Sequence, residues 1–312
     1  MGEGNVTEIN VREVVLDILL ELAKGEEYSN VLIAGVLDKY DYLEGREKAF
    51  IKRVCEGTIE RRIQIDFVLG QYSKTPVTKM KPLIRELLRM SVYQLLFMEH
   101  IPPAAVCNEA VKLAKKRRFS QLQGFVNGVL RNIARGKESI VWPDREKDQG
   151  AYLSVRYSMP LWLVEHFTDA YGPEACEKIL QAFLKRKAVC VRLDEGLTDG
   201  EREALLHAWE RQGAAVSGHP WLPYAFYLQG AAGVRHLAGY EEGRFAVQDA
   251  SSMLVVEAAG IRPEDTVVDV CAAPGGKALH AAGKLGGTGQ VIACDAVSYT
   301  HLRAHETVLD LV

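Results

Sequence analysis

The sequence predicts a multidomain chain in which an all-α bundle is followed by a small α+β domain and by the start of a parallel α/β domain. Three observations predict this order. Apolar residues recur at helical spacing through the first 138 residues. Between residues 151 and 240, helical patterns alternate with short apolar runs. Residues 266–295 then show the pattern strand, glycine loop, helix and strand.

The all-α domain is predicted to span residues 1–138. Apolar side chains repeat with helical spacing from Val11 to Leu22, and Gly25 then stops the helix. Prolines punctuate the later segments. The further helices are predicted at residues 30–40, 44–72 with room for one break, 83–99, 103–117 and 120–134.

The α+β domain is predicted to span residues 151–240, after a charged linker at residues 137–150. One helix should end at Tyr171, because Gly172 and Pro173 follow it. The remaining segments are predicted as a helix at 174–187, a strand at 188–193, a helix at 199–212 and a short strand at 225–228.

Composition limits the classes of function. A net charge of -3 means that any binding of nucleic acid depends on local basic clusters. The six cysteines include no C-x-x-C pair, so we expect reduced thiols rather than a zinc site or a disulfide frame. No apolar run approaches membrane length. We therefore expect a cytoplasmic protein without a membrane segment or a bound metal.

Two groups of basic residues are candidates for contact with phosphate. The first could bind a nucleic-acid backbone, or it could be a solvated helix end whose cations complement the helix dipole. The second lies in the α+β domain, where ordinary surface charge is the alternative. The first group is Lys112, Lys115, Lys116, Arg117 and Arg118, and the second is Lys185, Arg186, Lys187 and Arg192.

The glycine loop between the last two predicted strands is the candidate ligand site. Val267, Val268 and Val270 predict a strand buried on both faces of a sheet. Gly275 and Gly276 follow, and they let backbone N–H groups approach a ligand that a Cβ would block. Asp295 lies about 20 positions further on, where an acid can accept from ribose hydroxyls.

The spacing of this loop disfavours two common ligands. A P-loop needs Gly and Ser or Thr where this chain has Cys271 and Ala278, and the dinucleotide G-x-G-x-x-G spacing is absent. S-adenosylmethionine has adenosine and ribose but no phosphate, and its carboxylate could meet loop amides and Lys277. A tight strand-to-helix turn in another α/β protein stays open as the alternative.

The loop, with Asp269 before it, resembles the cofactor loop of the RNA (cytosine-C5) methyltransferases, the family that includes the RsmB-type ribosomal RNA enzymes. Ala278 departs from the Thr usual there, while residues 244–252 resemble the segment that precedes the fold in that family. The resemblance implies a Rossmann-like methyltransferase domain at residues 241–295 and S-adenosyl-L-methionine as cofactor. The implied cofactor-binding residues are Cys271, Ala272, Ala273, Pro274, Gly275, Gly276, Lys277 and Asp295.

The all-α domain resembles the NusB-like RNA-binding module, in residues 101–111 and 124–132. That module precedes the methyltransferase in bacterial RsmB-type enzymes, and the α+β domain also follows their pattern. The resemblance implies ribosomal RNA of the small subunit (16S) as partner, and we expect a monomer. It implies the N-terminal part of an S-adenosylmethionine-dependent rRNA (cytosine-C5) methyltransferase. The alternative is a non-enzymatic NusB-like RNA-binding protein, as in antitermination.

No catalytic residue is assigned. Enzymes of this family add a cysteine thiolate to C6 of cytosine and use a second cysteine in product release, and neither downstream motif occurs in this sequence. We expect Cys271 and Cys294 to be small packed residues instead. The polypeptide as written is therefore expected to be inactive. Residues 296–312 do not resemble the family's next helix, and we interpret them as a non-native tail, similar to a translated sequencing adapter.

Overall fold

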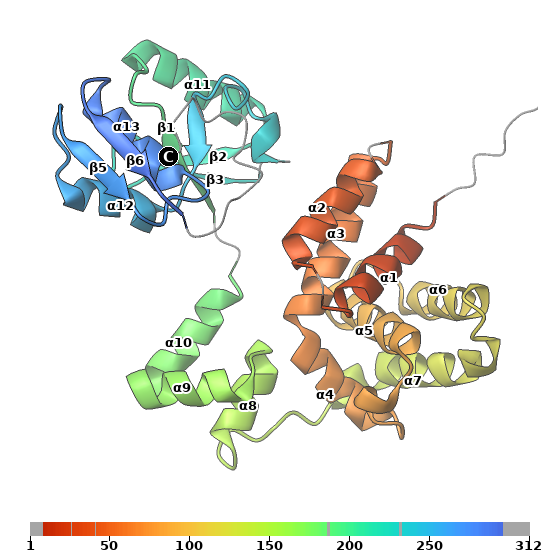
Figure 1. The fold of residues 1–312 in the computed structure, drawn as a ribbon. Helices are drawn as coiled ribbons and strands as arrows, with labels where there is room; N and C mark the ends of the chain where they lie inside the picture. The colour runs from red at the N-terminus through yellow and green to blue at the C-terminus, as the bar shows by residue number, and fades with distance from the viewer. Residues whose placement is uncertain (1–8, 26, 41, 186–187, 231–232, 296–312) are drawn as a thin grey trace, which may run out of the picture. The chain divides into compact units, whose positions relative to one another are not determined.

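The computed structural model describes residues 9–25, 27–40, 42–185, 188–230 and 233–295. The predicted tail at 296–312 lies outside these residues. The chain forms two compact units, Met1–Lys185 and Arg186–Val312, and each is described by itself (Figure 1). In the part of the chain that the structure describes, no helix is long and apolar enough to cross a membrane.

The first unit begins with a helical bundle built around α5 (Figure 1). The amphipathic helices α1, α3, α4, α6 and α7 pack on α5, whose apolar residues are buried along nearly its whole length. The predicted helices are present, and the long segment at 44–72 breaks at Arg61. The bounds are α1 Val11–Leu22, α2 Ser29–Lys39, α3 Gly45–Glu60, α4 Arg62–Tyr72, α5 Pro82–Phe97, α6 Pro103–Lys116 and α7 Gln123–Gly136.

A buried ion network crosses the bundle between α4 and α5. Arg89 donates to Glu86 Oε1 at 2.7 Å and to Asp66 Oδ2 at 2.6 Å, and Glu86 is only 1% exposed. Burial lowers the pKa of Arg89, but the hydrogen bonds and charges of Asp66 and Glu86 more than offset it, so the pKa is raised. The guanidinium and the two carboxylates therefore compensate one another's charge inside the bundle.

Three further helices complete the first unit: α8 Gln149–Tyr157, α9 Leu161–Tyr171 and α10 Pro173–Phe183. Their small core contains Leu153 and Val164. The helix α8 packs on α4, and Ser158 Oγ just after it accepts a hydrogen bond from the Ile63 N–H at 3.1 Å. These helices belong to the first compact unit, and the predicted start of the α+β domain at residue 151 stays a prediction. An amphipathic pattern predicts a helix without indicating which core receives its apolar face.

The second unit starts with a four-stranded antiparallel sheet in the order β2-β3-β1-β4. Its elements are β1 Val189–Leu193, α11 Asp199–Arg211, β2 Ala215–Gly218, β3 Ala225–Gln229 and β4 Phe245–Val247. One face packs on α11 through the fully buried Trp209, which meets Phe245 edge to face with ring centroids 4.7 Å apart. Cys190 on the other face packs with Met253 of α12, Ala250–Ala259. The predicted boundary at 240/241 lies before β4, which pairs with β1.

A parallel pair of strands follows, joined by one helix as predicted. The elements are β5 Thr266–Asp269, α13 Gly276–Leu285 and β6 Gln290–Ala293, and Thr266 pairs with Gln290. The helix α13 packs on both strands. However, Val268 is 55% exposed and Val270 is 69% exposed, so the expectation of burial on both faces is wrong for the described residues. Two strands and the helices beside them leave one side of β5 uncovered.

Candidate functional site

The predicted loop runs from the end of β5 to the start of α13. Gly275 N donates to Ala272 O at 2.6 Å, and Ala272 N donates to Cys294 O at 3.0 Å. The Ala273–Pro274 peptide bond is cis. Gly275 has φ +108°, in the region that favours glycine, and it directly precedes the helix. The loop is therefore folded tightly against the ends of both strands.

The structure brings the predicted acid, Asp295, to this loop. Its Oδ2 accepts a hydrogen bond from Ala273 N at 2.9 Å. The two residues meet because β5 and β6 are parallel neighbours, so that their carboxyl ends lie at the same edge. In this arrangement an adenosine-containing ligand could lie at the strand ends between the loop and the carboxylate. The role of Asp295 toward ribose stays a prediction.

The start of α13 is suited to an anion. The first N–H groups of a helix have no partner within the helix, and no side chain in the described part of the chain caps α13. The helix dipole adds partial positive charge there, and Lys277 contributes a full one. These groups fit the carboxylate of S-adenosylmethionine.

Two polar atoms beside the loop are buried without a hydrogen-bond partner among the described residues. They are Asp269 Oδ2 and Gln248 Nε2. A Cβ built on Gly276 would lie 4.0 Å from that Gln248 nitrogen. A polar ligand would supply partners for atoms of this kind. Gln248 was not predicted as a site residue, although it lies in the segment 244–252 that carried the resemblance.

The expectations for the two cysteines near the loop are wrong. Cys271 and Cys294 are both exposed, and the packed position in this loop is occupied by Ala272, which is 7% exposed. Exposure alone gives neither thiol a catalytic role. Among the residues that the structure describes, no group of His, Cys, Asp and Glu could hold a metal ion.

A cluster of ionisable side chains ties α13 to the four-stranded sheet. Lys284 Nζ lies 2.7 Å from Glu257 Oε1 and 3.1 Å from Glu195 Oε1. Burial lowers the pKa of Lys284, but both carboxylates more than offset this and raise it. Tyr224 donates a hydrogen bond to Glu257. Because these residues come from the ends of β1 and β3 and from α12 and α13, the cluster holds the loop's helix against the sheet.

His280 lies at the centre of this cluster and is fully buried. Its Nε2 is 3.3 Å from Glu195 Oε1, yet neither ring nitrogen has a hydrogen bond within the described residues. Burial, together with the charges of Arg192 and Lys284, lowers the pKa of His280 to about 4, and the charge of Glu257 opposes this only in part. The imidazole is therefore neutral at physiological pH.

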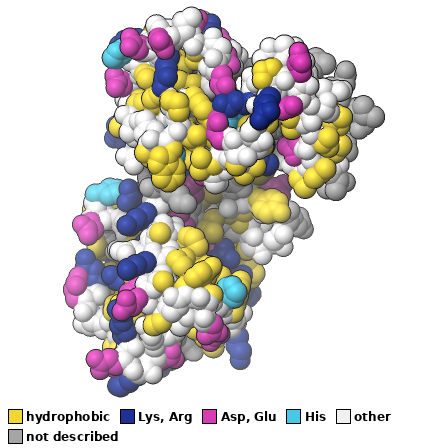
Figure 2. Space-filling view, turned by 90° about the vertical axis from the view of Figure 1, so that its left-hand side faces the viewer, with side chains coloured by type: hydrophobic (Ala, Val, Ile, Leu, Met, Phe, Trp, Pro, Cys, Tyr) yellow, Lys and Arg dark blue, Asp and Glu magenta, His cyan; other side chains and the backbone are white. Residues whose placement is uncertain are grey.

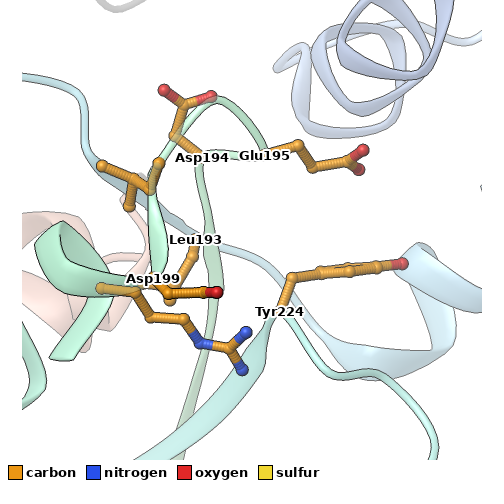
Figure 3. A pocket seen from close by; sticks show the side chains of 7 residues that line it. Leu193, Asp194, Glu195, Asp199 and Tyr224 are labelled. Atoms are coloured by element: carbon orange, nitrogen blue, oxygen red, sulfur yellow. The ribbon is translucent and has the colours of Figure 1, made fainter.

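A cavity of about 230 Å³ lies beside the cluster. Figure 3 shows Glu195 and Tyr224 extending toward the same side, while Asp194 points away from them. The volume of the cavity is below the roughly 300–1,000 Å³ typical of ligand pockets, and the carboxylates that line it would repel a carboxylate ligand. The cavity is therefore not the candidate cofactor site. It is lined by Leu193, Asp194, Glu195, Leu197, Asp199, Arg202 and Tyr224.

The first basic group is partly neutralised within the bundle. Lys116 Nζ lies 2.6 Å from Glu13 Oε2, and Arg117 pairs with the same carboxylate and with Asp17. Lys112 Nζ lies 2.8 Å from Glu109 Oε1. Lys115 and Arg118 have no salt-bridge partner among the described residues. On the face drawn in Figure 2, basic and acidic side chains are interspersed.

In the second basic group, one of the candidate residues is buried. Arg192 is 8% exposed within β1, so little of this candidate's side chain is accessible to a phosphate. A strand alternates its side chains between faces, and the sequence did not reveal that both faces of this sheet are covered. Lys185 is exposed. Arg186 and Lys187 lie outside the described residues.

Two family models match separate segments of the chain. Residues 9–135 match the NusB family, and residues 159–235 match the Methyltr_RsmF/B-like, ferredoxin-like domain. The helices α1–α7 occupy the first range, and the strands β1, β2 and β3 lie in the second. The chain thus combines a NusB-family domain with an RsmF/B-like ferredoxin-like domain.

Individual relatives are consistent with this class. The chain is 35% identical over 287 residues to "Probable ribosomal RNA small subunit methyltransferase B" of Bacillus subtilis (strain 168), covering 92% of this chain and 62% of that protein. It is 31% identical over 291 residues to the protein of the same name from Synechocystis sp. (strain ATCC 27184 / PCC 6803 / Kazusa), with 92% and 64% covered. The chain therefore spans less than two thirds of the length of these curated relatives.

A solved structure shares the fold of most of the chain. The crystal structure of PH0851 aligns with a TM-score of 0.70 at 21% identity, covering 93% of this chain and 65% of the other. At this identity the likeness shows the fold alone.

Proposed function

We propose that this chain is the N-terminal part of a cytoplasmic, monomeric S-adenosylmethionine-dependent methyltransferase that modifies cytosine C5 in small-subunit (16S) rRNA. The observation that carries the proposal is the glycine loop folded against the ends of two parallel strands, with Asp295 hydrogen-bonded to it. The names of the relatives support ribosomal RNA as the substrate. We propose residues 1–138 as the RNA-binding part, 151–240 as the middle domain and 241–295 as the start of the catalytic domain.

The residues of this chain would bind and orient the cofactor. The bound group would supply a methyl carbon on a positively charged sulfur. The N–H groups at the start of α13 and Lys277 would bind its carboxylate, and Asp295 would accept from its ribose. Gly276 would leave room for the ligand, because a Cβ there meets only Gln248, at 4.0 Å. No catalytic residue is assigned, and we expect purified residues 1–312 not to transfer methyl groups.

The first test is cofactor binding by the complete gene product that carries this sequence. Gly276→Val is expected to lower the affinity for S-adenosylmethionine by about tenfold or more, because its side chain would fill ligand space at the start of the helix. Gly283→Val is the matched control, since Gly283 lies in the same helix and is exposed, and a Cβ there would meet no described atom within 4 Å. Isothermal titration calorimetry would measure both.

The alternative function makes the opposite prediction. A non-enzymatic NusB-like protein would bind RNA without binding S-adenosylmethionine. If the complete gene product binds small-subunit rRNA but shows no heat of cofactor binding, the methyltransferase proposal fails.

The second test concerns the basic group at the end of α6. Lys115→Ala with Arg118→Ala should weaken rRNA binding and reduce the slope of log K against log salt by about 1 to 2, since each phosphate contact releases counterions. Lys112→Ala with Lys116→Ala removes the same charge from residues that pair with Glu109 and Glu13. Filter binding at several salt concentrations would measure both. Equal losses in the two double variants would contradict a specific contact at Lys115 and Arg118.

A further inference from the structure

The side chain of Gln248 has a fixed orientation between β4 and α12. It is 6% exposed, and its Oε1 accepts a hydrogen bond from Arg192 Nε at 2.7 Å. A guanidinium has donors and no acceptor, so the amide oxygen must face Arg192. The backbone is held as well, because Gln248 N donates to Cys190 O at 3.2 Å. The amide nitrogen therefore points away from Arg192.

That nitrogen lacks an acceptor within the described residues. Gln248 Nε2 is buried without a hydrogen bond, which native structures seldom tolerate. The side chain is anchored at its oxygen end, so it cannot turn to find another partner without losing the bond to Arg192. An acceptor from outside the chain would satisfy it.

The free donor lies at the start of α13. A Cβ on Gly276 would be 4.0 Å from both Cδ and Nε2 of Gln248, and Gly276 is the first residue of that ten-residue helix. Among the described residues no side chain caps this end, which carries partial positive charge, and Lys277 follows. The surroundings therefore favour an acceptor that is also negatively charged.

We propose that Gln248 donates a hydrogen bond from Nε2 to the carboxylate of the bound cofactor, and that Arg192 is the positioning residue that holds the amide in this orientation. This rests on the proposed function, because S-adenosylmethionine has one carboxylate and no phosphate. Because this nitrogen is buried beside Gly276, the bond requires the backbone there to move aside when the cofactor binds. The four-stranded sheet, through Arg192 of β1, thus contributes to a site formed at the parallel strands.

The test compares two ligands that differ in one group. S-adenosylmethionine and decarboxylated S-adenosylmethionine would be titrated into the complete gene product by calorimetry. Gln248→Met keeps the length of the side chain and removes the donor. It should therefore lower the affinity for S-adenosylmethionine by about tenfold and leave the affinity for the decarboxylated ligand unchanged. Gln248→Glu should lower the affinity for S-adenosylmethionine more strongly, because it places two carboxylates together. It should not lower the affinity for the decarboxylated ligand.

Arg192→Met tests the positioning role through the ratio of the affinities for the two ligands. It should lower the preference for S-adenosylmethionine over the decarboxylated ligand, an effect that a general loss of stability would not produce. The control is Gln212→Met, since Gln212 is exposed and, within the described residues, its amide bonds only to the backbone of His236 and Ala238. It should leave both affinities unchanged.

The outcomes separate this inference from the proposed function. If Gln248→Met weakens both ligands equally, or neither, the donor does not meet the carboxylate and the inference is overturned. If the unaltered protein binds neither ligand, the proposed function fails and the inference fails with it.

Discussion

Replacing Arg89 by Met should lower the stability of the first unit by about 3 to 5 kcal/mol, the cost of breaking a buried ion pair on one side. The reason is the carboxylate that remains. Glu86 is 1% exposed, and without Arg89 its one remaining ion-pair partner among the described residues is Arg85, whose Nε lies 3.1 Å from Glu86 Oε1. Protection of α5 amides against hydrogen exchange would measure the loss, because it reports on this unit separately from the second.

Two variants control this experiment. Lys24→Met removes an exposed pair with Glu21 and should change stability by no more than about 1 kcal/mol. Glu86→Leu combined with Arg89→Met removes both strongly buried charges and should recover much of the loss. An Arg89→Met protein as stable as the Lys24→Met protein would show that the network contributes nothing.

Acidification from pH 7 to pH 4 should destabilise the second unit by up to about 3 kcal/mol through His280 alone. The pKa of His280 is lowered to about 4 by burial first and then by Arg192 and Lys284, with Glu257 opposing. Below about pH 6.5, His280 binds a proton in the unfolded chain but not in the folded chain. The stabilisation is therefore complete above that pH and is lost progressively as the pH falls toward 4.

The acid sensitivity can be assigned with matched variants. His280→Phe should flatten the dependence of stability on pH between about 6.5 and 4, whereas His207→Gln, at an exposed position of α11, should leave it unchanged. Exchange of α13 amides, corrected for intrinsic rates at each pH, would follow the transition. Glu195, Glu257 and Tyr224 also face the imidazole. A slope that survives His280→Phe would show that His280 is not its source, and Glu257, whose pKa is lowered, would be the next group to replace.

The spacing of apolar residues predicted where the helices lie better than it predicted which elements they pack against. Helical spacing located α1 to α7 within a few residues, because each helix buries one stripe against the bundle. The helix α8 was missed, since it begins inside a charged segment that reads as a linker. The strand β2 was missed as well, because Ala215–Gly218 is short and mostly exposed and so carries little apolar pattern.

The candidate site shows the same division. Glycine spacing and the position of Asp295 predicted the loop, since both depend on chain order within one βαβ unit. Gln248 could not be found in this way, because its place beside Gly276 depends on how β4 and α12 pack. The exposure of Cys271 and the burial of Arg192 likewise depend on neighbours that are distant in the sequence.

The pairing of β4 with β1 has a practical consequence for dividing the protein. A cut between residues 240 and 241 would remove the edge strand and, with α12, the Met253 side chain that covers Cys190. The separated piece would present β1 as a bare edge with unpaired N–H and C=O groups beside newly exposed apolar surface. Such an edge recruits other strands, so this piece should aggregate when it is expressed alone.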